Sequence, residues 1–103
     1  MNNHDPFDLS TQEDKRQTSD EKARNAQRVE RDDIIWLMSG KRGRRVAHQL
    51  LTRAGLWRLS FSTNALQMAF NEGMRNEGLA LTAKIMAHCP ARYAEMLTEN
   101  QND

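Results

Sequence analysis

Apolar side chains recur at helical spacing through most of the second half of this chain. The clearest case is the segment from Arg42 to Ala54. At about 100° per residue, one continuous side of it collects the apolar residues Val46, Ala47, Leu50, Leu51 and Ala54. Arg44 falls on the opposite side with the other polar residues, which we expect to face solvent. Gly55 follows in the position of a helix stop, with Leu56 as the hydrophobic contact of a Schellman motif. The pattern predicts a helix over residues 42–54.

A longer helix is predicted after Ser62 or Thr63, either of which can serve as its N-cap. Apolar residues continue at helical spacing from residue 65 to residue 86, interrupted by Gly73 and Gly78. Glycine is unfavourable inside a helix, so these two positions suggest a kink or the close approach of another backbone.

A last short helix is predicted after the Cys89-Pro90 step, because proline suits the first helical position. In it Tyr93, Met96 and Leu97 are expected to face inward. We expect the tail from Thr98 to be loose.

The segment between the two longer helices has a different pattern. Trp57, Leu59 and Phe61 alternate with other residues, which taken alone is typical of a short strand. Because no second strand candidate occurs in the sequence, we expect an ordered connector whose aromatic residues fill a helical core. The predicted fold class is therefore all-α: a small helical hairpin or a three-to-four-helix domain.

Residues 1 to about 28 are strongly polar, with Phe7 and Leu9 as the only large apolar side chains after the initial methionine. A helix is predicted from about Asp20 to Met38, with an apolar face only near its end. Such a segment buries too little to order itself, so we expect a charged arm, residues 1–30, that is partly disordered or ordered by a partner. Residues 31–103 form the predicted helical domain, and Ser39-Gly40 ends the helix that leads into it.

Charge is distributed unevenly along the 103 residues. Residues 1–38 contain six basic and nine acidic side chains, and residues 61–103 contain three and five. The stretch between them has no acidic residue and six basic ones: Lys41, Arg42, Arg44, Arg45, Arg53 and Arg58. Such an asymmetry indicates an acidic partner, either the phosphates of a nucleic acid or a carboxylate-rich protein surface. A solvated helix face that is simply rich in arginine is the alternative.

Metal binding, nucleophilic catalysis and sequence-specific DNA recognition are only weakly indicated by the sequence. His48, His88 and Cys89 lack a fourth residue for a structural zinc site, and no group is placed to activate Cys89 as a nucleophile. The helical spacing of Glu72, Arg75 and Glu77 fits ion pairs that fix packing. A helix-turn-helix around Gly55 is disfavoured, because the residues after it are too apolar to read a DNA groove. We predict no enzymatic activity, no cofactor and no metal.

The single cysteine excludes an intramolecular disulfide, and neither a signal peptide nor a membrane-spanning stretch is expected. We therefore expect a protein of the cytoplasm, or of a particle assembled there.

The stretch from Leu37 to Leu97 resembles a small domain family of tailed bacteriophages, named after a gene product of a Bordetella podovirus. The resemblance rests on the order of short motifs: Leu37-Met38-Ser39, Gly43-Arg44-Arg45-Val46, Leu50-Leu51, Ala54-Gly55, Leu56-Trp57-Arg58, Ser60-Phe61, Phe70, Glu72-Gly73, Arg75, Gly78-Leu79 and Cys89-Pro90. It implies a small, mostly helical protein encoded among phage head and tail genes, with no established catalytic activity. The arm before Arg31 has no counterpart in it.

These observations together predict a virion-associated structural protein of the head, the connector or the internal ejection apparatus. We expect it in several copies, bound to other virion proteins or to DNA without sequence preference through the basic residues. The alternative is a soluble DNA-binding accessory or regulatory protein that acts during infection outside the particle.

Overall fold

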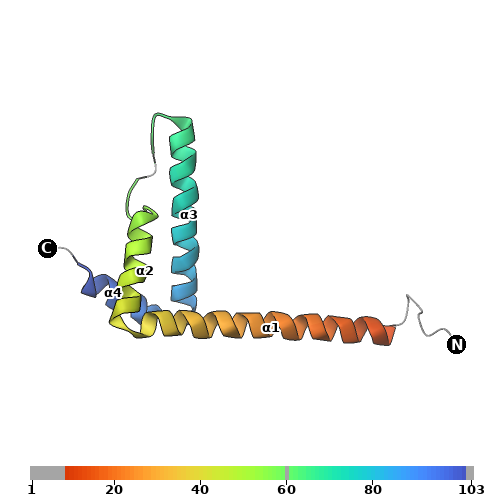
Figure 1. Ribbon diagram of the computed structural model, residues 1–103. Helices are drawn as coiled ribbons and strands as arrows, with labels where there is room; N and C mark the ends of the chain where they lie inside the picture. Colours follow the sequence, from red (N-terminus) through yellow and green to blue (C-terminus); the bar gives the residue numbers. More distant parts are fainter. Residues whose placement is uncertain (1–8, 60, 102–103) are drawn as a thin grey trace. The chain divides into compact units, whose positions relative to one another are not determined.

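The computed structural model describes residues 9–59 and 61–101, which form helices and connecting turns without a strand (Figure 1). The helices are α1 (Leu9–Ser39), α2 (Lys41–Arg53), α3 (Ala65–His88) and α4 (Pro90–Glu99). The predicted all-α class is confirmed. By its internal contacts the chain divides into two units, Met1–Glu30 and Arg31–Asp103, and each is described on its own.

The described part of the first unit, residues 9–30, is entirely helical. Helix α1 begins at Leu9, well before the predicted start at Asp20, and the Thr18 hydroxyl donates a hydrogen bond of 2.9 Å to the carbonyl of Asp14. All of these side chains except half-buried Glu30 are exposed. A helix that is polar on all sides lacks an apolar face to hold it against a domain. Residues 1–8 of the predicted arm lie outside the described residues.

The second unit starts with a tight corner between α1 and α2. Gly40 has an extended backbone and is the N-cap of α2. Gly43, one turn into α2, passes so close to α1 that a Cβ added there would lie 1.8 Å from the carbonyl oxygen of Leu37. Only glycine fits such an approach, because the atom it meets belongs to the backbone and cannot move aside.

Helix α2 ends in the predicted Schellman motif. Gly55 has a φ of +79°, the conformation that glycine adopts without strain. The amide of Leu56 donates a hydrogen bond of 3.2 Å to the carbonyl of Leu51, and the amide of Gly55 donates one of 3.0 Å to the carbonyl of Thr52. These two bonds define the motif, and Leu56 then turns into the core.

The connector differs from the prediction. Leu56 is the residue that fills the core, whereas Trp57 is half exposed and Leu59 and Phe61 are 93% and 75% exposed. The expectation that the alternating aromatic residues fill the core was therefore wrong. The predicted cap was also wrong, because Asn64 caps α3: its side-chain oxygen accepts a hydrogen bond of 3.1 Å from the amide of Gln67.

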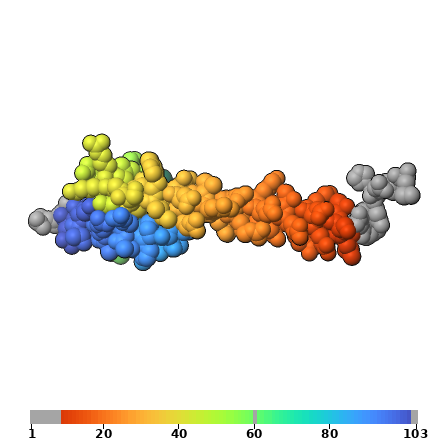
Figure 2. Space-filling view, turned by 90° about the horizontal axis from the view of Figure 1, so that it is seen from below, coloured from red at the N-terminus to blue at the C-terminus, as the bar shows by residue number. Residues whose placement is uncertain are grey.

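The core lies where α2, α3 and α4 meet the last turn of α1. It consists of Met38, Ala47, Leu51, Leu56, Ile85 and Met96. Tyr93 and Leu97 pack against it, as predicted for the last helix. The prediction of a loose tail from Thr98 was wrong, because the helix continues to Glu99. In Figure 1, α2 and α3 run alongside each other, and Figure 2 shows the blue surface of α4 against the yellow start of α2. At Gly78 of α3 a Cβ would lie 2.9 Å from that of Ala54, so one of the two predicted glycines marks a close approach.

Candidate functional site

Four of the six predicted basic residues share the outer face of α2. Lys41, Arg42, Arg45 and Arg53 are all exposed. At about 100° per residue they fall within about 120° of arc, opposite the buried side chains of Ala47 and Leu51. Because α2 contains no acidic residue, its outer face presents four positive charges without an interspersed carboxylate. We call Lys41, Arg42, Arg45 and Arg53 the basic face.

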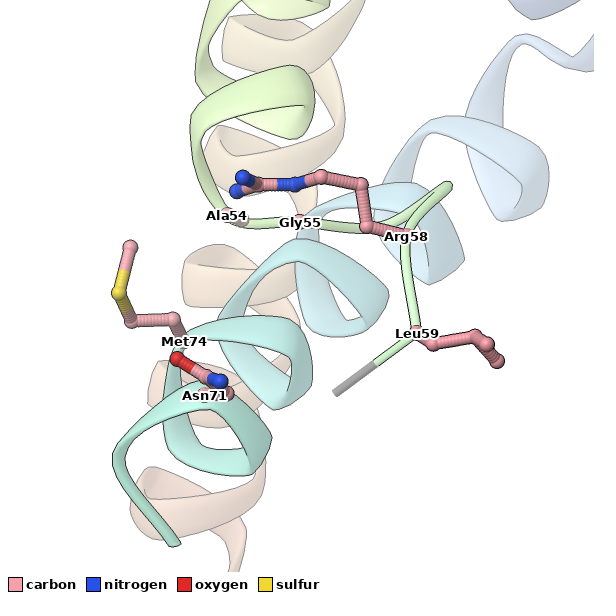
Figure 3. Close-up of a pocket in the computed structure, with 6 residues that line it drawn as sticks. All are labelled: Ala54, Gly55, Arg58, Leu59, Asn71 and Met74. Atoms are coloured by element: carbon pink, nitrogen blue, oxygen red, sulfur yellow. The ribbon is translucent and has the colours of Figure 1, made fainter. Parts of the chain in front are cut away.

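Arg58 is placed differently, at the end of α2. Its guanidinium runs back past Gly55, with Nη2 3.3 Å from the position that a Cβ of Gly55 would take. Figure 3 shows this side chain beside Asn71 and Met74 of α3, around a hollow of about 90 Å³. A cation at this end is favourable because the carbonyl groups at a helix C-terminus carry partial negative charge. Arg58 therefore borders the basic face without belonging to it.

Arg44 departs from the prediction most clearly. Its side chain is buried, with 5% of the residue exposed, and it bridges α2 to α4. Nε and Nη2 donate to the two carboxylate oxygens of Glu99 at 2.7 and 2.9 Å, and Nη1 donates to the carbonyl of Met38 at 2.9 Å. Glu95 adds an ion pair at 3.3 Å. Two parallel bonds of this kind are the strong geometry for an arginine and a carboxylate.

The electrostatics agree with that geometry. The hydrogen bond from Arg44 is the main cause that lowers the pKa of Glu99, and the positive charges of Lys41 and Arg45 lower it further. The same bond raises the pKa of Arg44. Both groups are therefore charged near neutral pH, and the pair fixes α2 on α4 with its basic face outward.

Sequence reasoning placed Arg44 on the solvent side, although a signal was present. Residues 44, 47 and 51 share one side of a helix by their three- and four-residue spacing. Arginine has a long apolar stem, so it can occupy an apolar side if a carboxylate meets its head. That carboxylate, Glu99, comes from 55 residues further along the chain.

The other residues considered from the sequence lie elsewhere. His48 stacks on Trp57 with ring centroids 5.1 Å apart, while His88 ends α3. Burial raises the pKa of the Cys89 thiol, the opposite of the shift that activates a nucleophile. Within residues 9–59 and 61–101, no three His, Cys, Asp or Glu side chains come together as metal ligands. The Nε of Arg75 is buried without a hydrogen-bond partner.

The second unit is thus a small all-α domain whose second helix is anchored by a buried ion pair and turns a basic face outward. The family model described as Bbp19-like phage protein matches residues 35–98. Since the match spans more than half of the chain, the protein belongs to this phage family, and the resemblance seen in the sequence is confirmed. The match includes the whole of α2 and α3 and most of α4.

No match was found among curated proteins or among solved structures. In the described part of the chain, the helices are too short or too polar for any of them to cross a bilayer.

Proposed function

We propose that this phage protein is a non-enzymatic structural component of the virion, present in several copies in the head, the connector or the internal ejection apparatus. In this role the basic face contacts an acidic neighbour, either packaged DNA or another virion protein, with Arg58 at its border. The observation that carries the proposal is the basic face itself, together with the buried Arg44–Glu99 pair that holds it outward. Membership of the phage family supports the setting.

The chemistry of the basic face suits a structural contact. Guanidinium groups bind phosphates and carboxylates through two parallel hydrogen bonds. Contacts of this type to a nucleic-acid backbone do not select a sequence and weaken steeply with salt. Such contacts are individually weak and are repeated many times. Packaged DNA, or an acidic surface of another virion protein, is present at high local concentration and provides a suitable partner.

The first test is quantitative mass spectrometry of purified particles before and after triggered genome release. We expect the chain in full particles. Its loss on release would indicate an ejected internal protein, and its retention would indicate a head or connector component. Absence from full particles would overturn the proposal and favour the accessory DNA-binding protein that acts outside the particle.

A matched pair of variants tests the role of the basic face. The triple change Lys41→Gln, Arg42→Gln and Arg45→Gln removes three of its charges, and Lys15→Gln, Arg16→Gln and Lys22→Gln removes three from the first unit. We expect the first variant alone to lose incorporation into particles. If DNA is the partner, the salt dependence of its DNA binding should fall by about 0.9 in slope for each cation that contacts a phosphate. Equal incorporation of both variants would exclude the basic face as the contact.

A further inference from the structure

A second surface lies beside the basic face and is largely apolar. Trp36, in the last turns of α1, is 77% exposed, and Val46 and Leu50 of α2 are each half exposed. The sequence pattern predicted that Val46 and Leu50 would be buried with Leu51. Instead, Arg44 shares the buried side of α2 with Ala47 and Leu51, and Val46 and Leu50 lie outside it. We call Trp36, Val46 and Leu50 the apolar strip.

The members of the apolar strip are continuous on the surface. Trp36, Leu37, Gly43 and Val46 line a groove of about 410 Å³ at the corner between α1 and α2. Val46 also borders a second hollow that reaches Leu50. Leu50 lies one helical turn beyond Val46, about 6 Å along α2. The strip therefore runs from Trp36 across the groove to Leu50.

The charges at the two ends of the apolar strip are opposite. Asp33, one turn before Trp36 on α1, is exposed at one end. Arg53, one turn after Leu50 on α2, is exposed at the other. Read along the surface, the order is carboxylate, indole, Val46, aliphatic side chain and guanidinium. If a second copy is turned by 180° about an axis through Val46, its carboxylate faces the guanidinium of the first copy and its indole faces the aliphatic side chain. The order is therefore complementary to itself.

We infer that the apolar strip is a docking surface for a second copy of this chain, which packs against it antiparallel about a two-fold axis near Val46. In that arrangement Trp36 of each copy covers Leu50 of the other, so the groove beside Gly43 of each copy lies against the Leu50 end of the other copy's strip. Asp33 of each copy faces Arg53 of the other, which gives two symmetry-related ion pairs at the rim. An isologous dimer requires a self-complementary patch of this kind.

A nucleic acid fits the apolar strip less well. Asp32 and Asp33 flank Trp36 on the outer side of α1, and their carboxylates repel phosphates. The half-exposed Val46 and Leu50 offer apolar area that a phosphate backbone does not use. Tryptophan and arginine are, in contrast, the residue types that dominate binding energy in protein interfaces.

The inference extends the proposed function without depending on it. Lys41 and Arg45 lie farther round α2 than the apolar strip and stay outside the contact. A dimer then presents two sets of these cations on one particle component, and the avidity of paired sites exceeds that of one. Failure of the dimer would leave the basic face of a single copy intact.

Sedimentation equilibrium of the purified full-length chain tests the inference directly. We expect a concentration-dependent species of twice the chain mass of 11.9 kDa. Trp36→Ala should weaken association at least about tenfold, as loss of a central aromatic anchor does. Leu66→Ala, at an exposed leucine of α3 far from the strip in sequence, is the control and should leave association unchanged. Wild-type protein that remains monomeric at all concentrations would overturn the inference, including the case in which it binds DNA instead.

Charge exchange tests the pairing of the two ends. Asp33→Arg places two cations together and Arg53→Glu places two anions together, so neither variant should form a homodimer. An equimolar mixture of the two should form a heterodimer, because one of its ion pairs is then reversed and the other keeps its original form. The double variant in one chain should dimerise again. If the wild type dimerises but these exchanges leave its affinity unchanged, a different surface mediates the contact and the inference is wrong.

Discussion

At the scale of single residues, Arg44 has the largest structural role of the basic side chains. A buried cation is stable only when it is paired and hydrogen-bonded, and Arg44 has both oxygens of Glu99 and the carbonyl of Met38 as partners. Lysine cannot replace it, because an ammonium group cannot make two parallel bonds to one carboxylate while reaching a third acceptor. The pair also determines which basic residues remain for a partner.

Glu99 makes the stability of the fold depend on pH. Its pKa is lowered in the folded state from an ordinary value of 4.5, so the stability it contributes is present above that value and is lost as the pH falls through the folded pKa. We expect Glu99→Gln to be less stable than the wild type at pH 7, with the difference shrinking below about pH 4.5. Urea unfolding of both proteins at several pH values from 7 to 3 measures this difference in the free energy of unfolding.

The control for Glu99 is an Arg44→Met background. Without the guanidinium, Glu99→Gln should have a smaller effect at pH 7, because the two residues act as a pair. A stability difference between Glu99→Gln and wild type that stays constant over the whole pH range would contradict the assignment.

At the scale of elements, two glycines determine how closely the helices approach. Gly43 lets α2 turn against the end of α1, and Gly78 lets α3 lie against Ala54 at the end of α2. Gly73 differs from both, because nothing lies within 4 Å of the position where its Cβ would be. The two glycines of α3 therefore differ: packing requires a glycine at position 78 but not at position 73.

Gly73→Ala and Gly78→Ala should therefore change stability in opposite directions. Alanine at 73 gains helix propensity, and we expect it to raise the free energy of unfolding by about 1 kcal/mol. Alanine at 78 must push α3 away from Ala54, a repacking that costs roughly 1–3 kcal/mol, so the net change should be a loss. Thermal unfolding of both variants measures the signs. Stabilisation by Gly78→Ala would show that α2 and α3 are not packed as closely as described.

At the scale of the whole molecule, a small core coexists with much exposed apolar surface. The core cluster has six buried members, while Leu59, Phe61, Leu66 and Phe70 are all more than 60% exposed. A domain of this size is expected to have a small free energy of unfolding. Association with another chain adds to the stability of the folded state by mass action.

Leu51→Ala should show how strongly the fold depends on that core. Leu51 is fully buried between α2 and its neighbours, and its truncation leaves a cavity, so we expect a loss of about 2–5 kcal/mol in the free energy of unfolding. Leu66→Ala removes the same atoms from an exposed site and should change stability by less than about 0.5 kcal/mol. Chemical denaturation of the two variants provides the comparison. Similar losses in both would mean that Leu66 is buried in solution by a partner.

The helices of the second unit could be predicted from the sequence because their signals are local. The Schellman stop at Gly55, the proline start at Pro90 and the inward Met96 follow from residues within one or two turns of each other. The N-cap at Asn64 was missed because Ser62, Thr63 and Asn64 are all good caps and only the path of the connector selects one. The connector aromatics were misplaced because their burial depends on how far the core extends along α3.

The sequence by itself determined the all-α class, the family and the concentration of positive charge between residues 41 and 58, because composition, periodicity and motif order are properties of neighbouring residues. Only the tertiary structure decided which of those charges face outward. Arg44 is buried because Glu99, from the far end of the chain, pairs with it. Val46 and Leu50 are half exposed, and Arg44 is on the buried side of α2 in their place. The partition of one helix into a buried side, a basic face and an apolar strip is set by contacts between residues distant in sequence.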